Sequence, residues 1–90
     1  MCAGCEQAVY ASTLQYMAET GVHLEIALRL TRDVVVQNAI ADQHDEMKSD
    51  EVVLATIRDL CSTLDTVADR MRAMNPAAIQ ALVAMLDRST

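Results

Sequence analysis

The chain has 90 residues, of which 52% are hydrophobic, and it carries a formal net charge of −6. Because nucleic acids and anionic membrane surfaces are bound chiefly through Lys and Arg, this charge argues against both as partners. Phe and Trp are absent and there are only two Gly and one Pro, so the chain lacks the turn residues of a β-fold and an all-α fold is expected.

The N-terminal segment contains a C-x-x-C motif, formed by Cys2 and Cys5. One domain is expected over residues 1–90, with residues 1–5 as a flexible tail. A zinc site needs four ligands and a thioredoxin-like site needs a preceding strand, and the sequence offers neither. Both cysteines are therefore predicted to be dispensable, and no metal site is expected.

Residues 6–42 are predicted to form one long helix. The stretch "VHLEIALRL" at 22–30 alternates apolar and polar residues, so a hairpin of strands at 22–37 is the alternative. That hairpin would lack the Gly-rich turn that short hairpins favour, and two strands alone are marginally stable. In the helical interpretation the 4-3 apolar spacing continues through Gly21. Whether Gly21 breaks the helix stays open, and one helix bent at Gly21 is favoured because no good N-cap follows.

This helix is expected to be apolar on two sides. At 100° per residue the large aliphatic residues form two nearly opposite rows, Leu24, Leu28 and Val35 on one side and Ile26, Leu30 and Val34 on the other. The next helix in the chain can cover one row. The other row needs the C-terminal helix or a second copy of the chain, so a homo-oligomer is expected, with a dimer favoured.

Residues 50–74 are predicted to form the second helix, with Ser49 as N-cap and Asp50 and Glu51 at the positive end of the helix dipole. Its apolar residues repeat with 4-3 spacing, which defines a core seam. The seam residues proposed as core or interface are Ile57, Leu60, Leu64, Val67, Met71 and Met74. Leu54, Cys61 and Ala68 widen this face, which favours a bundle over a two-stranded coiled coil.

The last helix is expected over residues 76–88, because Asn75 is a good N-cap and Pro76 fits a first helical turn. The predicted fold is a small antiparallel helical bundle, with a long helical hairpin and a short C-terminal helix, completed by oligomerisation. No β-sheet is expected.

No catalytic arrangement of residues is found in the sequence, so no enzyme activity, catalytic residue or cofactor is predicted. No apolar run approaches the roughly 20 residues that span a bilayer, and the start does not resemble a signal peptide, so a cytoplasmic protein is expected. The favoured function is a small acidic interaction module, adaptor-like or regulatory, that self-associates and has a possible protein partner. The alternative is a bundle that binds a small apolar ligand, in the cleft between the last two helices near Met71 and Met74.

Overall fold

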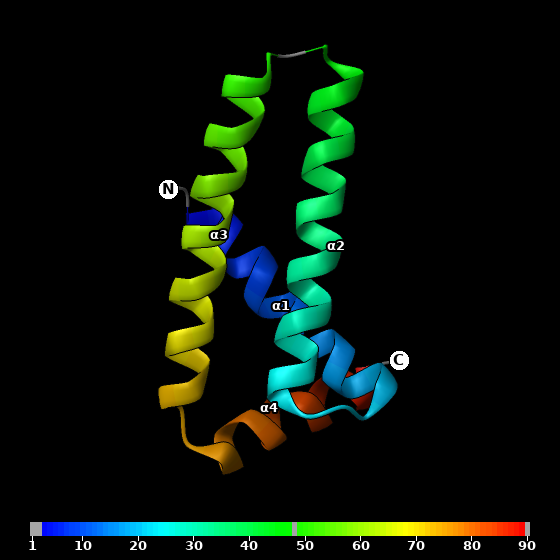
Figure 1. Cartoon of the computed structure of the whole chain (residues 1–90). Coiled ribbons are helices and arrows are strands. Elements are labelled where there is room, and N and C mark those ends of the chain that lie inside the picture. Colours follow the sequence, from blue (N-terminus) through cyan, green and yellow to red (C-terminus); the bar gives the residue numbers. More distant parts are fainter. Residues whose placement is uncertain (1–2, 48, 90) are drawn as a thin grey trace.

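Four α-helices make up the part of the chain that the computed structural model describes, residues 3–47 and 49–89 (Figure 1). The helices are α1 (Ala3–Thr20), α2 (Leu24–Asp45), α3 (Asp50–Ala73) and α4 (Pro76–Ser89). No strand occurs among these residues. The prediction of an all-α fold is therefore confirmed, and the alternative of a strand hairpin at 22–37 is wrong.

The prediction of one helix over residues 6–42 is wrong, because the helix is interrupted at Gly21. Gly21 has φ +69°, in the left-handed region that glycine adopts without steric cost. Its N–H donates to the carbonyl oxygen of Met17 at 3.0 Å, which closes the last turn of α1. The helix resumes at Leu24, and the carbonyl oxygen of His23 accepts the first bond of α2 from Ala27 N–H at 2.9 Å.

The start of the chain also differs from the expectation. α1 begins at Ala3, so residues 3–5 are helical, although they were expected in a flexible tail. Cys5 is exposed on α1, and Cys2 lies outside the described residues.

The N-caps of α3 and α4 are the residues that the sequence predicted, Ser49 and Asn75. Ser49 has extended backbone angles, and its hydroxyl accepts from Val52 N–H at 3.4 Å, so α3 begins at Asp50 as predicted. The Asn75 side-chain oxygen accepts from Ala77 N–H at 2.8 Å and starts α4. Each cap satisfies a backbone N–H that the first turn of a helix leaves without an internal partner.

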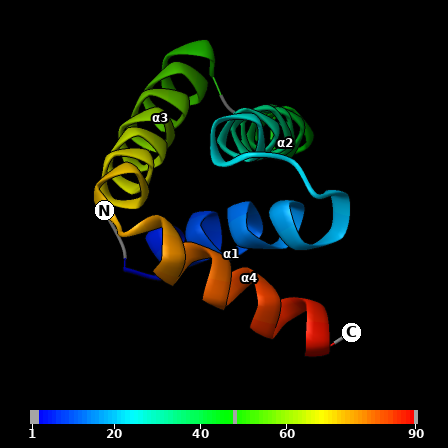
Figure 2. The same ribbon diagram turned by 90° about the horizontal axis from the view of Figure 1, so that it is seen from below.

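The helices are arranged around one long hairpin. The chain runs along α2, reverses at the top of Figure 1 and returns along α3. α1 packs against α2, α3 and α4. Seen from below in Figure 2, α1 crosses beside the hairpin, and α4 lies on the far side of α1. The two shorter helices therefore accompany the lower part of the hairpin only.

The core lies where α1 meets α2, α3 and α4. Its buried apolar residues are Val9, Leu14, Met17, Ala27, Leu28, Leu64, Val67, Ala68, Met71 and Ile79. Two fully buried threonines lie at the contact of α1 and α2, where the Thr13 hydroxyl is 3.2 Å from the Thr31 hydroxyl and 2.9 Å from the Val9 carbonyl oxygen. These contacts satisfy polar groups that would otherwise be costly to bury.

Candidate functional site

The hydrophobic core stops halfway along the hairpin. On α2 the last buried residue is Thr31, and on α3 the first is Thr63. Among the side chains that the structure describes between them, none is buried. We call residues 32–45 of α2 and 50–62 of α3 the distal half of the hairpin, and the remainder of these two helices the proximal half.

The core seam predicted on α3 is divided by this boundary. In the proximal half Leu64, Val67 and Met71 are buried, and Met74 packs against them half-buried. In the distal half Ile57 and Leu60 are only half-buried. The 4-3 spacing is the same in both halves, so the sequence pattern of α3 does not explain the difference in burial. The difference arises because α1 covers only the proximal half.

The two rows predicted on α2 also have different environments. In the first row Leu28 is buried, and Leu24 and Val35 are half-buried. In the second row Leu30 is half-buried, whereas Ile26 is 44% exposed and Val34 is 40% exposed. The C-terminal helix packs against α1, and Ile26 and Val34 of the second row stay exposed to solvent.

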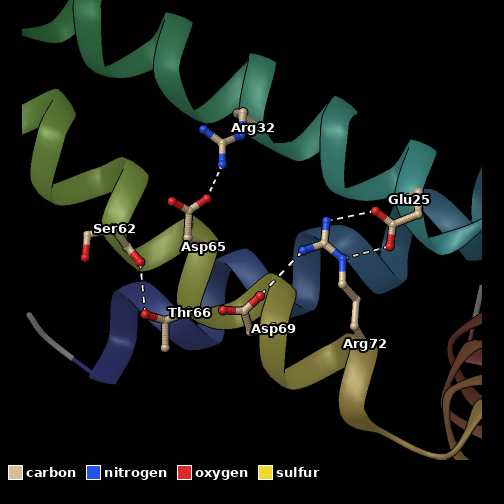
Figure 3. A network of polar contacts seen from close by, with 7 residues as sticks. All are labelled: Glu25, Arg32, Ser62, Asp65, Thr66, Asp69 and Arg72. Atoms are coloured by element: carbon tan, nitrogen blue, oxygen red, sulfur yellow. Dashed lines mark hydrogen bonds and ion pairs between the residues drawn. The ribbon is translucent and has the colours of Figure 1, made fainter.

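Ion pairs link α2 and α3 in the proximal half and at its boundary with the distal half (Figure 3). Arg32 on α2 pairs with Asp65 on α3. Arg72 donates two hydrogen bonds to the Glu25 carboxylate, at 2.9 and 2.8 Å, and lies 3.5 Å from Asp69. Glu25, Arg32, Asp65 and Arg72 line a groove of about 250 Å³ between α2 and α3.

The doubly hydrogen-bonded pair of Glu25 and Arg72 shifts the pKa of both partners. The hydrogen bonds from Arg72 lower the pKa of Glu25, and those to Glu25 raise the pKa of Arg72. A further ion pair, Arg70 to Glu6 at 2.6 Å, connects α3 to α1. The proximal half is thus covered by α1 on one side and bridged by ion pairs on another.

Four of the nine large aliphatic side chains in the distal half are exposed, and the other five are half-buried. The exposed fractions are 40% for Val34, 46% for Ile40, 44% for Val52 and 61% for Leu54. Outside the distal half, Met85 on α4 is 62% exposed. Because these four exposed aliphatic residues lie on two adjacent helices that bury no described side chain in this region, the distal half is the first candidate site.

An open cavity of about 550 Å³ lies at the other end of the hairpin, where Gly21 and the start of α2 face the junction of α3 and α4. Its walls are mainly apolar, and its polar side chains are those of His23, Glu25, Arg72 and Gln80. The lining residues are Met17, Gly21, Val22, His23, Leu24, Glu25, Met71, Arg72, Met74, Pro76, Ile79, Gln80 and Val83. The volume of this cavity is within the range of small-molecule binding sites. The cavity includes Met71 and Met74, near which the sequence analysis placed the alternative site for an apolar ligand.

The remaining chemical groups form no cluster. Within the described residues, no three His, Cys, Asp or Glu side chains lie close enough together to hold a metal ion. Cys61 is half-buried in the distal half, and His23 lies at the cavity. In the same residues, no helix is long and apolar enough to cross a membrane.

The residues proposed from sequence as core or interface omitted α1, although α1 contributes to the core. Val9, Thr13 and Met17 are buried at i, i+4 spacing, but the residues proposed as core or interface began only at Leu24. The spacing itself was a usable signal. Leu14 and Met17 followed the apolar spacing, whereas Thr13 gave no apolar signal, since threonine is mostly an exposed residue.

Comparison with known proteins adds no assignment: no family model, curated protein or solved structure matches the chain. Its function is therefore inferred from the two features described above, the apolar distal half and the cavity at the base of the hairpin. The distal half contains Val34, Val35, Ile57 and Leu60, four of the residues that the sequence proposed as core or interface.

Proposed function

We propose that the chain is a small acidic interaction module that self-associates through the distal half of its hairpin. In this proposal two copies complete an antiparallel helical bundle, and the interface replaces the cover that α1 gives to the proximal half. The observation that carries the proposal is the seam on α3, which stays apolar at Ile57 and Leu60 but has no buried member there. No catalytic step is assigned to this module, and its proposed location is the cytoplasm.

The surface area of the chain supports a second copy as the occupant. The chain exposes 6090 Å², whereas a compact monomer of 9.8 kDa exposes about 5,200 Å². The excess of about 900 Å² is close to the roughly 800 Å² that each partner buries in a standard protein interface. The radius of gyration, 14.3 Å, also exceeds the roughly 12 Å of a compact 90-residue domain.

A matched pair of variants tests this proposal. Leu54→Asp places a charge in the distal half, and Met85→Asp places one on α4 at nearly the same exposure, 61% against 62%. Both sites are exposed, so neither change buries a charge in a single copy. We expect Leu54→Asp to weaken self-association at least about tenfold in sedimentation equilibrium, because a charge in an apolar interface must be desolvated.

The Met85→Asp control should have a dissociation constant close to that of the unaltered chain. A monomeric mass for the unaltered chain at high micromolar concentration would contradict the proposal. Equal dissociation constants for all three proteins would show that the copies associate through another surface.

A second candidate function is the binding of a small apolar molecule in the cavity at the base of the hairpin. The specific observation in its favour is the lining, in which Met17, Met71 and Met74 meet Ile79 and Val83. Methionine side chains adapt to ligands of different shape. Candidate ligands are neutral apolar molecules, because the charged pair at the cavity, Glu25 and Arg72, is already internally compensated.

This second function is tested with a neutral, environment-sensitive fluorescent probe. Val83→Trp narrows the cavity and should abolish probe binding, whereas Val52→Trp, in the distal half, should leave it unchanged. Equal binding to both variants would place the probe elsewhere on the protein.

A further inference from the structure

The negative charge of the chain is concentrated at one end of the hairpin. The segment 42–51, which joins α2 to α3, contains five acidic residues and one Lys, a net charge of −4 out of −6. We call this segment the tip. The other 80 residues contain eight acidic and six basic residues and therefore carry only −2.

This distribution distinguishes the two ways in which two distal halves can pack side by side. In a parallel arrangement the tips are neighbours, and two groups of charge −4 face each other within about one helix diameter, 10 Å. That distance is close to the Debye length of about 8 Å at physiological ionic strength, so the repulsion is only partly screened. In an antiparallel arrangement the tips lie at opposite ends of the shared bundle.

The separation in the antiparallel arrangement follows from helix geometry. The distal part of α3 has thirteen residues, 50–62, so full overlap places the two tips about 20 Å apart along the bundle, at a rise of about 1.5 Å per residue. This is more than two Debye lengths. Each tip then lies beside the level at which Arg32 and Asp65 of the other copy compensate one another.

We infer that the second copy packs antiparallel on the distal half, with the two acidic tips at opposite ends and the level of Ile57 near the two-fold axis. This inference rests on the proposed self-association and adds its orientation. The apolar positions are compatible with it, because Val53 and Leu60 lie nearly equally far from Ile57 along α3 and exchange levels under the two-fold rotation.

The experiment measures distances between spin labels in the dimer. All three cysteines are replaced (Cys2→Ser, Cys5→Ser and Cys61→Ala), and one new cysteine is introduced by Met47→Cys at the tip or by Arg58→Cys near the middle of the distal half. Both sites are exposed, Met47 at 90%. The antiparallel dimer predicts a distance between the tip labels that exceeds the distance between the middle labels by about 15–20 Å.

The outcomes separate the orientation from the self-association itself. Light scattering on each labelled variant first establishes the dimer, and a monomeric mass would refute the proposed function and with it the inference. A dimeric mass with similar distances at both sites would refute the antiparallel orientation alone, because in a parallel dimer the tips are as close as the middle.

A charge variant provides an independent readout. Asp42→Asn, Glu46→Gln and Glu51→Gln together remove three charges from the tip. In the antiparallel dimer the dissociation constant at physiological salt should change by less than about threefold, since the tips are more than two Debye lengths apart. A larger tightening would show that the tips adjoin and would overturn the inference.

Discussion

Replacing Gly21 by Ala should destabilise the protein, and the sign of this effect tests the break between α1 and α2. Gly21 has φ +69°, and a Cβ atom added there would meet no atom within 4 Å. The cost is therefore conformational and not steric. For an L-residue the left-handed conformation costs about 1–2 kcal/mol, so the free energy of unfolding should fall by that amount.

A continuous helix through residue 21 predicts the opposite result. In a helix interior Ala is more favourable than Gly by about 1 kcal/mol, so Gly21→Ala would raise the free energy of unfolding. The change in the free energy of unfolding that Gly21→Ala should cause thus differs by about 2–3 kcal/mol between the broken and the continuous helix. Urea denaturation followed by circular dichroism readily measures a difference of this size.

Gly21→Asn is the matched control, because Asn tolerates the left-handed region better than Ala does. It should be less destabilising than Gly21→Ala. A stabilised Gly21→Ala variant would refute the helix break and restore the single helix that the sequence favoured.

Three further changes probe the core, an ion pair and a cap. Leu64→Ala removes a side chain that is 4% exposed and should lower the free energy of unfolding by about 2–5 kcal/mol in urea titrations; a loss near zero would show that the site is not packed. The carboxyl group of Glu25 should titrate below its ordinary pKa in NMR, and Arg72→Gln should raise this pKa, because the charged hydrogen bonds stabilise the ionised form. The stability from this pair is present above the pKa of Glu25 in the unfolded chain and is lost as the pH falls through the lowered folded pKa; a Glu25 pKa that is unchanged by Arg72→Gln would contradict the pairing. Asn75→Ala should cost about 1 kcal/mol by removing the α4 cap, and an unchanged melting curve would argue against that cap.

The parts of the fold that could be predicted from sequence are those fixed by local signals. Ser49 and Asn75 began helices where expected, since a cap depends on residues within one turn. The 4-3 spacing correctly placed Leu64 and Met71 in the core.

The break at Gly21 was harder to predict because local signals conflicted. The apolar spacing continued through Gly21, and although Met17 and Val22 are placed to end a helix at Gly21, no strong N-cap follows to start the next one. The backbone carbonyl of His23 begins α2 without the preferred side chain.

The candidate site could not be derived from local pattern at all. Ile57 and Leu64 lie seven residues apart and occupy equivalent positions in the same seam, yet Ile57 is half-buried and Leu64 is buried. The difference in burial depends on how far along the hairpin α1 extends. This is set by the packing of segments that are distant in sequence. Sequence indicated that some apolar surface needed a cover, and the structure identifies which part lacks one.

Amide hydrogen exchange at micromolar and millimolar protein concentration tests the central claim most directly, namely that a second copy covers the distal half of the hairpin. Residues 50–62 of α3 should exchange more slowly at the higher concentration, because the dimer must dissociate or open before these amides reach solvent. Over the same concentrations residues 63–73, already covered by α1, should gain less protection. Exchange in residues 50–62 that does not depend on concentration, together with a mass that stays at 9.8 kDa, would contradict the claim.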